Sequence, residues 1–573
     1  MLGSYIDPKS SFYDHVVIDI ETIDPLLKIS GVSWVRDIGK ILGIACKIGD
    51  AKAEYYPVGH GIGSYDPDKV RLYFNDLMKV CRQDSTPVVA HFAQYDLGWL
   101  DHEKYIDIEN VPPIFCTLVG SQLYNSSMQS FSLDAMSRYF KHGQKIAIDI
   151  DKLISMPVSV VAKYACNDID LTDLLYDRLI HEELDKKAVI RENAVIPLLV
   201  MMKKQGIKVD LEYLEWLDRE FQMRLHTAMT NLIKIDPQIN INAGASIELL
   251  FRRFAIPYQR TAHGNPSFTQ GFLDSVALTN PLIADLSIAR KLKRLLAFIT
   301  GIKQMQHNGI IHPDYWNGKS DWGGTVTGRL SASNPNIQQM PNRTEEGKMI
   351  RGAFVSHGDA WGRADYSQQE PRIAMHYASL LHLSGIDYWL ERYKNNPDQD
   401  FYQIIMERAG IDRKSAKTFT LATMYGMGAA HAGELLGIDE REAGTQLLSF
   451  HRSVPWLKEL QHYVFDKVDK AHKVKTLGDR FLTFNHREPK AFNHLIQGSA
   501  ADQIKQAMVN IYNETGKIPL CQVHDELNYD LNVDEIATEM DEQISRIMRE
   551  AIPLQVPGKV DFTMGMSWKE ACE

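Results

Sequence analysis

Cysteine is scarce in this sequence, and no two cysteines stand close together. The 573 residues include six cysteines, and none of them form a Cys-x-x-Cys pair. This spacing argues against a disulfide framework and against a zinc site, and it favours a reducing, cytoplasmic compartment. No apolar run is long enough to span a bilayer. The polar segment Met1–Ser10 also lacks the apolar core of a signal peptide, so we expect neither a membrane anchor nor secretion.

An excess of positive charge is also missing. The net charge is −10, which argues against a protein that coats nucleic acid by charge alone. An enzyme with a local basic groove stays possible, and clustered carboxylates that hold metal ions would also make the net charge negative. No internal repeat or low-complexity tract is present, and the length indicates about three or four domains.

The N-terminal part of the chain has the pattern of an α/β domain. Residues 12 to about 150 mix helical stretches with short β-rich runs, namely Val16–Ile20, Ile41–Ile48 and Val88–His91. From about 150 to 235 the pattern becomes mostly helical. A domain boundary is expected near 185–195, where a charged stretch meets an apolar run.

Residues 288–304 have the pattern of a basic amphipathic helix. Four basic residues alternate with leucine and isoleucine there. One interpretation is a solvated helix face above a core stripe. The other is a helix that lies along a phosphate backbone.

A first pair of carboxylates lies in the apolar run that begins at Val16. Side chains alternate between the two faces of a strand, so Asp19 and Glu21 share a face about 7 Å apart. Such a pair suits a divalent cation, because unpaired buried charges are costly. The alternative is a strand end that runs into solvent and leaves Glu21 at the surface.

Two further segments add acids to this pair. Asp96 ends an apolar strand and turn, and Tyr164 and Asp168 share one helix face at i and i+4. In order and spacing, the three segments resemble the exonuclease motifs of the DEDD family, in its tyrosine-bearing branch. The resemblance implies an RNase H-like fold in which Asp19, Glu21, Asp96 and Asp168 hold two metal ions and Tyr164 orients the attacking water. Phe92 and Cys116 depart from the asparagine and aspartate common in the family, but neither change removes a metal ligand.

A second acidic cluster is predicted in the C-terminal half. Asp365 ends the predicted strand Ala360–Asp365, and Asp525 lies in a segment that reads as a strand or hairpin. With simple alternation, Asp525 would share a face with Val523 and Leu527, while His524 would point the opposite way. Two aspartates from neighbouring strands could share a metal pair about 4 Å apart. The alternative is two unrelated surface acids.

A helix stripe lies between these two acids in the sequence. Arg413, Lys417, Leu421 and Tyr425 follow one another at i, i+4 steps. Two cations, an apolar residue and an aromatic ring in line could bind a triphosphate and stack a base. The alternative is a basic helix face with a core tyrosine.

These segments resemble motifs A, B and C of family A DNA polymerases, the class of the large fragment of DNA polymerase I. Thr327–Ser331 with Pro335–Gln338 resembles the family's TGRLSS…PNLQ segment, Gln497–Asp502 resembles QGTAAD, and Ser567-Trp568 fits the family's ending. The similarity runs from about residue 12 to the end. It implies a multidomain α/β and α+β fold, in which an RNase H-like exonuclease domain (1–187) precedes a right-hand polymerase domain (188–573). Within the latter we expect a thumb at about 190–315, a palm at about 316–375 and 480–573, and fingers at about 376–479.

The resemblance also implies roles for single residues. Asp365, the Tyr366 carbonyl and Asp525 would hold two Mg²⁺ ions per active site, with Mn²⁺ as a substitute, and Glu526 would support this metal site. The expected deoxynucleotide-binding residues are Tyr366, Gln368, Glu370, Arg413, Lys417, Leu421, Tyr425 and Gly426. Lys417 would also protonate the leaving group. The expected DNA-binding residues are Arg329, Asn493, Gln497 and His524.

Two positions bear on substrate choice. Glu370 resembles the steric gate that occupies the space of a ribose 2′-hydroxyl. Leu421 replaces the usual phenylalanine or tyrosine, and a branched aliphatic side chain offers no aromatic edge near the sugar 3′ position. We therefore expect strong discrimination against dideoxynucleotides.

The predicted function is template-directed extension of a primer with deoxynucleotides, with 3′–5′ proofreading. The expected partners are primer–template DNA, deoxynucleoside triphosphates, and replisome proteins such as a helicase and a single-strand-binding protein. The enzyme is expected to act as a monomer in the cytoplasm. A short thumb and the lack of a 5′-nuclease domain favour a phage replicase. The alternatives are a repair-type polymerase, a single-subunit RNA polymerase, a polymerase with an inactive exonuclease, a scaffold paralogue and a nuclease with a binding module.

Overall fold

The computed structural model describes residues 14–261, 264–321, 323–486 and 488–573. The first 13 residues of the predicted exonuclease domain lie outside the described residues. The chain forms two compact units. The first comprises residues up to 206, 312–338 and 362–563, and the second comprises 207–311, 339–361 and 564–573.

The first unit begins with a five-stranded mixed sheet. Its strands are β1 (Val16–Ile23), β2 (Lys40–Ile48), β3 (Glu54–Pro57), β4 (Val88–Ala90) and β5 (Ile114–Cys116). The spatial order is β3-β2-β1-β4-β5; β1, β2 and β3 pair antiparallel, whereas β4 lies parallel to β1 and β5. The predicted strands near 16, 41 and 88 are thus confirmed. β1 is rich in valine and isoleucine, which suits a strand that is buried at the centre of the sheet.

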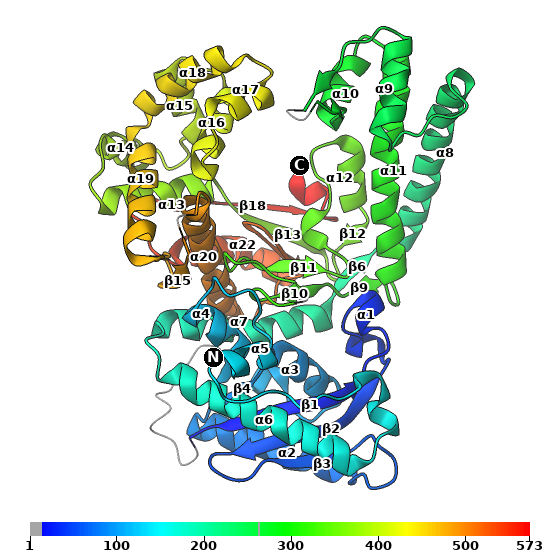
Figure 1. The fold of residues 1–573 in the computed structure, drawn as a ribbon, viewed down its shortest axis with the longest axis vertical. Helices are drawn as coiled ribbons and strands as arrows, with labels where there is room; N and C mark the ends of the chain where they lie inside the picture. The colour runs from blue at the N-terminus through cyan, green and yellow to red at the C-terminus, as the bar shows by residue number, and fades with distance from the viewer. Residues whose placement is uncertain (1–13, 262–263, 322, 487) are drawn as a thin grey trace. The chain divides into compact units, whose positions relative to one another are not determined.

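Helices surround this sheet. They are α1 (Leu27–Ser30), α2 (Pro67–Asp84), α3 (Ala93–His102), α4 (Thr117–Tyr124), α5 (Leu133–Tyr139), α6 (Val158–Ile180) and α7 (Lys186–Gln205), with short 3₁₀ turns at Trp34–Arg36, Ile108–Asn110 and Ile150–Ser155. In Figure 1 α6 runs across the sheet, and it packs on β1, β2 and β3. Asp185 caps α7 through the Lys187 N–H, and Gly206 ends it with a positive φ of 66°.

A second sheet, most of whose residues belong to this unit, has the order β16-β17-β13-β18. Its strands are β13 (Ala360–Tyr366), β16 (Cys521–Val523), β17 (Glu526–Leu531) and β18 (Val560–Gly565). The strand predicted at 360–365 is therefore confirmed. The helices of this part are α13 (Gln369–Leu380), α20 (Ala491–Thr515), α21 (Val533–Ala537) and α22 (Met540–Glu550). Two short pairs accompany them, β10 (Asp314–Trp316) with β11 (Ser331–Ser333) and β14 (Lys473–Lys475) with β15 (Phe481–Thr483), together with a 3₁₀ turn at Ile337–Gln339.

A helical subdomain lies between α13 and β14 in the chain. It contains α14 (Ile386–Asn395), α15 (Phe401–Ala409), α16 (Arg413–Tyr425), α17 (Ala429–Leu436), α18 (Glu440–Ser453) and α19 (Pro455–Ala471). Its core includes the fully buried pair Trp389 and Trp456, whose ring centroids are 5.9 Å apart. Asp412 caps α16 through the Ser415 N–H. The helix predicted from the stripe at 413–425 therefore has the predicted bounds.

The second unit is mostly helical. It contains α8 (Leu211–Ile235), α9 (Gly244–Arg253), α10 (Gln270–Ala277), α11 (Pro281–Met305) and α12 (Glu345–Arg351), a sheet of β12 (Phe354–Val355), β6 (Ile207–Val209) and β9 (Ile310–Ile311), the hairpin of β7 (Gln259–Arg260) and β8 (Pro266–Ser267), and a 3₁₀ turn at Glu570–Cys572. The helix predicted at 288–304 lies within α11. Among the described residues, no helix combines the length and the apolar character needed to cross a membrane.

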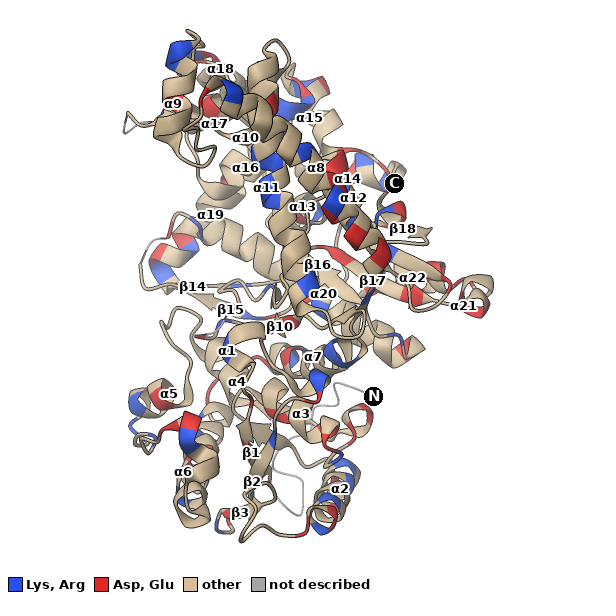
Figure 2. Ribbon diagram, turned by 90° about the vertical axis from the view of Figure 1, so that its right-hand side faces the viewer, with Lys and Arg blue, Asp and Glu red and all other residues tan. Residues whose placement is uncertain are grey.

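The basic residues of α11 divide between the two interpretations of its sequence. Arg290 donates to the Phe268 carbonyl and Lys291 lies 3.7 Å from Glu346, so these two cations serve the unit itself. Lys293 and Arg294 are exposed, whereas the leucines beside them are buried. Figure 2 colours the basic residues of α11 blue. Two cations of this helix therefore remain available to a ligand.

Candidate active sites

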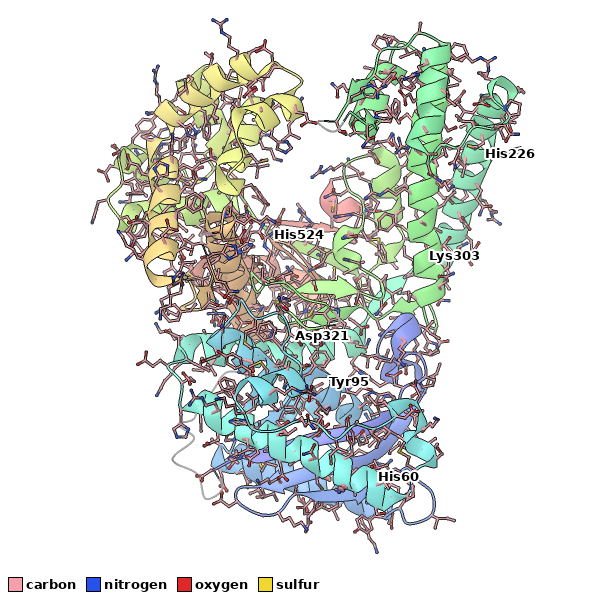
Figure 3. The ribbon with its side chains drawn as sticks, in the orientation of Figure 1. His60, Tyr95, His226, Lys303, Asp321 and His524 are labelled. Atoms are coloured by element: carbon pink, nitrogen blue, oxygen red, sulfur yellow. The ribbon has the colours of Figure 1, made fainter. Side chains whose placement is uncertain are left out.

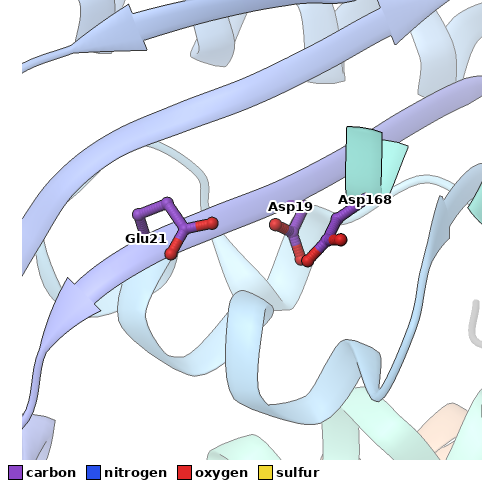
Figure 4. A group of neighbouring side chains, drawn as sticks. All are labelled: Asp19, Glu21 and Asp168. Atoms are coloured by element: carbon purple, nitrogen blue, oxygen red, sulfur yellow. The ribbon is translucent and has the colours of Figure 1, made fainter. Parts of the chain in front are cut away.

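Three carboxylates converge where α6 crosses β1. Asp19 and Glu21 come from β1 and Asp168 comes from α6. Each offers one oxygen atom, and these atoms all lie within 4.8 Å of one another. In Figure 4 the carboxylates of Asp19 and Asp168 lie side by side, with Glu21 farther along the strand. The structure thus joins two of the three predicted exonuclease segments.

Helix α3 brings Asp96 to the same strand. The Ile20 N–H donates to Asp96 Oδ1 over 3.2 Å, and Asp96 is buried. Phe92, the residue directly before the helix, has a positive φ of 64°, a region that disfavours most side chains. The Phe92 ring stacks on Trp316, with centroids 5.5 Å apart and planes 9° apart. This stacking holds the phenylalanine ring in place, at the position where the exonuclease family that these motifs resemble commonly has asparagine.

Burial and mutual repulsion raise the pKa values of these acids. Burial, followed by the charge of Asp168, raises the pKa of Asp19 to about 7. Burial and then the charge of Asp19 also hold the pKa values of Glu21 and Asp96 well above their usual range. Such a cluster is stable in its ionised form only with cations beside it.

The donor set fits a divalent cation. All its ligand atoms are carboxylate oxygens, which Mg²⁺ and Mn²⁺ prefer. Asp168 Oδ1 is buried and has no hydrogen-bond partner among the described residues, so it could bind an ion without losing a bond. Tyr164 is buried one helical turn before Asp168, on the same face.

A lysine that the sequence motifs did not indicate also reaches this cluster. Lys145 Nζ lies 2.5 Å from Asp168 Oδ2 and 5.3 Å from the centroid of the Tyr164 ring. Lys145 belongs to the irregular segment between α5 and α6, where no periodic pattern points to a partner.

The second carboxylate cluster is built by backbone pairing. Asp365 lies near the end of β13, and the next residue, Tyr366, donates its N–H to the Asp525 carbonyl over 3.1 Å. Asp525 lies in the turn between β16 and β17, because Val523 pairs directly with Glu526. The predicted alternation of side chains through 523–527 is therefore wrong. His524 has a positive φ of 59° and is labelled in Figure 3. The backbone of the turn, not strand alternation, therefore sets the directions of the His524 and Asp525 side chains.

Repulsion also raises the pKa values in this second cluster. Burial, followed by the charge of Asp525, raises the pKa of Asp365 to about 7, and burial raises that of Asp525 to about 6. Arg363, two residues before Asp365 on the same strand, pairs with Asp365 and donates to Glu526 Oε2 over 2.8 Å. Glu526 is buried and accepts a second bond from Asn528. Strand alternation could have indicated Arg363 from the sequence.

Two polar contacts join other predicted residues near these aspartates. Arg329 Nη2 lies 2.5 Å from Glu370 Oε1, in the first turn of α13. The charges of both residues act on Asp525. Gln497 on α20 donates to the Tyr425 hydroxyl over 3.1 Å. The structure thus links the predicted DNA-binding residues to the predicted nucleotide-binding residues.

Helix α16 presents its predicted stripe in part to solvent. Lys417 and Tyr425 are exposed, Leu421 is half-buried, and Gly426 ends the helix with a φ of 69°. Arg413 is also exposed, and it donates to Asp400 Oδ2 over 2.9 Å. A bound phosphate would compete with Asp400 for this guanidinium.

Three predicted residues have their polar groups engaged or covered. The Gln368 side chain donates to the Gln399 carbonyl and accepts from Tyr393 and from the Phe401 N–H. The Tyr366 hydroxyl donates to the Met548 carbonyl, so only its backbone carbonyl is relevant to a metal. Asn493 is buried, and its Nδ2 has no partner among the described residues. These contacts give Gln368 a role in shaping the start of α15.

A buried group of five charges lies on α7, α20 and the turn between β14 and β15, and the motifs did not indicate it. We call it the ion network; it consists of Arg191, Glu192, Arg480, Asp502 and Lys505. Lys505 Nζ lies 2.5 Å from Glu192 Oε2, and Arg191 Nη2 lies 2.9 Å from Asp502 Oδ1. A Cβ atom on Gly328 would lie 1.2 Å from Arg480 Nη1. The network therefore joins α7, α20 and the turn between β14 and β15, and Arg480 packs closely against Gly328, next to Arg329.

Comparison with known proteins finds two families that match this chain. Residues 36–183 match the family described as 3′-5′ exonuclease, and residues 211–570 match the family described as DNA polymerase family A. The fold is similar to that of the POL domain of Pol1 from M. smegmatis, solved in complex with DNA primer-template and dNTP. That likeness has a TM-score of 0.79 at 23% identity and covers 99% of this chain and 97% of that one.

Relatives occur in phages and in bacteria. The chain is 29% identical to a DNA-directed DNA polymerase of Pseudomonas phage M6, over 96% of this chain and 93% of that protein. It is 30% identical to DNA polymerase I of Chloroflexus aurantiacus, over 72% of this chain and 47% of that protein. It thus spans about half the length of the bacterial relatives. The match to the polymerase family covers more than half of the sequence and includes Asp365 and Asp525. The chain therefore belongs to DNA polymerase family A and is a DNA-directed DNA polymerase with a 3′–5′ exonuclease domain.

Proposed function

We propose that the protein replicates a phage genome by extending primer 3′ ends on a DNA template, and that it removes mispaired ends with its own exonuclease. Each centre would use two Mg²⁺ ions, for which Mn²⁺ can substitute. The substrates are primer–template DNA and deoxynucleoside triphosphates. The phage relative, which matches over 93% of its own length, supports replication over the repair alternative.

One observation carries this proposal. Each centre gathers acidic side chains: Asp19, Glu21 and Asp168 offer oxygen atoms within 4.8 Å of one another, and main-chain pairing brings Asp525 beside the strand of Asp365. Burial and repulsion raise the pKa values there, to about 7 at Asp19 and at Asp365. Such an arrangement destabilises the metal-free protein, and bound divalent cations would offset this destabilisation. Bound metal ions would supply a lowered pKa for the attacking oxygen and balance the charge of the reacting phosphate.

At the polymerase centre, Asp365, Asp525 and the Tyr366 carbonyl would hold the metal ions. The primer 3′-oxygen forms a bond to the α-phosphorus while the bond from that phosphorus to pyrophosphate breaks. The hydroxyl proton leaves to solvent, and pyrophosphate takes a proton from Lys417, which is exposed on α16. Arg413, released from Asp400, binds the outer phosphates. Glu370, fixed by Arg329, leaves no room for a 2′-hydroxyl.

At the exonuclease centre, Asp19, Glu21, Asp96 and Asp168 would hold the metal ions. A water oxygen forms a bond to the phosphorus of the terminal phosphodiester while the bond to the 3′-oxygen of the preceding nucleotide breaks. The water gives up a proton, and the leaving 3′-oxygen takes one up. The products are a nucleoside monophosphate and a shortened primer. Tyr164, buried beside Asp168, orients the attacking water.

A primer-extension assay on a 5′-labelled primer–template in Mg²⁺ tests both centres. The assay compares deoxynucleotides, ribonucleotides and no nucleotide for wild type, Asp365→Ala and Asp19→Ala/Glu21→Ala. We expect wild type to extend the primer with deoxynucleotides and to shorten it without them. Each variant should lose one activity by at least about 100-fold and keep the other.

Two exposed acids serve as matched controls. Asp84→Ala in the exonuclease domain and Asp534→Ala on α21 remove a carboxylate from the surface, and both should keep both activities. Equal extension with ribonucleotides would contradict the role of Glu370. Loss of both activities in Asp365→Ala would contradict the division into two separate centres.

A further inference from the structure

Lys145 is held in place through its backbone. Its N–H donates to Asp134 Oδ1 over 3.1 Å, and the next N–H, of Ile146, donates to Asn167 Oδ1 over 3.0 Å. Asp134 belongs to α5 and Asn167 to α6. The segment between these helices has no regular secondary structure around Lys145, yet two side-chain acceptors fix it at this residue.

The side chain of Lys145 extends from this anchored backbone to the exonuclease carboxylates. Its ammonium group lies 2.5 Å from Asp168 Oδ2 and near the ring of Tyr164. The Lys145 side chain is 32% exposed, whereas that of Asp168 is 3% exposed. The lysine therefore lies at the rim of the cluster, between the buried metal ligands and the solvent from which DNA must approach.

A charge count indicates what a cation at this rim can do. Four carboxylates carry four negative charges, which two divalent ions offset. The phosphodiester then brings one more negative charge, and its transition state is more negative still. The positive charge of Lys145 acts on all four acids, so it is placed to offset the charge that the substrate adds.

We propose that Lys145 binds a non-bridging oxygen of the phosphodiester that the exonuclease cleaves, and that Asp168 holds the ammonium group in place until DNA arrives. This inference rests on the proposed exonuclease function. It assigns to the irregular segment before α6 a direct part in DNA binding. It concerns only the exonuclease centre, so polymerase activity should not depend on it.

The test compares Lys145→Ala, Lys145→Arg and the control Lys163→Ala, each in the full-length chain. Lys163 is exposed on α6, one residue before Tyr164, so its loss removes an equal charge nearby. Three quantities are measured: the exonuclease rate at saturating single-stranded DNA in Mg²⁺, the affinity for the same DNA in Ca²⁺, and primer extension. In addition, Mn²⁺ affinity is measured in the Asp365→Ala/Asp525→Ala background, so that only binding at the exonuclease centre contributes to the signal.

We expect Lys145→Ala to lower the exonuclease rate by about 100-fold or more and to weaken DNA binding, with extension unchanged. Lys145→Arg should keep the rate within about tenfold of wild type, because arginine also binds phosphate. Mn²⁺ affinity should stay equal or become tighter, because a cation has been removed beside the ligands.

Two results would overturn the inference. One is a Lys145→Ala rate within about threefold of wild type. The other is a parallel loss of Mn²⁺ affinity, because that would show that Lys145 only keeps Asp168 in position as a metal ligand. If wild type itself does not degrade single-stranded DNA in Mg²⁺, the proposed exonuclease function fails, which is a distinct outcome.

Discussion

The fold buries Asp365 beside other acids, which makes its ionised form unfavourable. Its pKa is about 7 and that of Asp525 is about 6, whereas an aspartate in an unfolded chain has a pKa of about 3.9. The folded chain therefore binds more protons than the unfolded chain between these values. By linkage, the metal-free protein loses stability as the pH rises from about 4 to about 7.

Magnesium should reverse this loss, and the effect should depend on pH. At pH 5.5 protons compete with Mg²⁺ for both aspartates, and at pH 8 they do not. We expect saturating Mg²⁺ to raise the melting temperature by at least about 2 °C more at pH 8 than at pH 5.5. Differential scanning fluorimetry measures this shift, and Asp365→Asn/Asp525→Asn should reduce the difference. Equal shifts at both pH values would contradict the assignment of these acids as metal ligands.

Leu421 leads to a prediction on substrate choice. The side chain is half-buried on α16 between exposed Lys417 and Tyr425, and it has no aromatic edge to offer near a nucleotide sugar. We expect Leu421→Tyr to raise the efficiency of dideoxynucleotide incorporation, relative to deoxynucleotides, by at least about tenfold. Single-nucleotide insertion kinetics measure the ratio. Efficient chain termination by wild type would refute the role of Leu421.

At the scale of the element, the ion network fixes three parts of the first unit. Burial alone would raise the pKa of Glu192, but Arg480, Lys505 and Arg191 together lower it to about 2. Burial and the two guanidinium groups lower the pKa of Lys505 to about 8. Three buried cations thus share two buried carboxylates. Such a group depends on having every member present.

Removing one carboxylate should therefore be costly. We expect Glu192→Gln to lower the free energy of unfolding by about 3–5 kcal/mol, because it leaves three buried cations facing Asp502 alone. Urea unfolding followed by circular dichroism measures the change. Glu192→Gln/Lys505→Met should recover part of the loss, whereas Glu391→Gln, at an exposed position of α14, should change little. A loss below about 1 kcal/mol for Glu192→Gln would show that the network contributes little.

The sequence pattern predicted several elements and failed at others for identifiable reasons. β1, β13 and α16 lie where alternation and i, i+4 spacing placed them, because these rules act within one element. The rule failed at 524–525, where a two-residue turn determines the side-chain directions. Lys145 was missed because its partner, Asp168, lies 23 residues later in another element. Contacts of this kind leave no local pattern in a sequence.

At the scale of the whole molecule, net charge and DNA binding oppose one another. The chain carries a net charge of −10, so its attraction to DNA must come from local groups of cations. Lys293 and Arg294 on α11 are exposed and offer one such group. DNA affinity should then depend steeply on salt, with a slope set by the number of phosphate contacts.

Neutralising this pair should change the slope in a countable way. We expect Lys293→Ala/Arg294→Ala to reduce the slope of log affinity against log salt concentration by about 2, and to weaken binding equally for different DNA sequences. Fluorescence anisotropy at several KCl concentrations measures the slope. Lys69→Ala/Lys79→Ala, on α2, removes two exposed cations elsewhere and is the matched control. An unchanged slope for the α11 variant would exclude this helix from the DNA contact.

The hydrogen bond from the Tyr366 N–H to the Asp525 carbonyl has a consequence for how this enzyme can vary. It joins main chain to main chain, so the spacing of the two acids does not depend on the identity of the side chains around them. Neighbours such as Gln369 and Pro371, at the start of α13, can then be varied without moving the two main-chain groups. Engineering of nucleotide selectivity can begin at these neighbours, with the geometry of the metal ligands left intact.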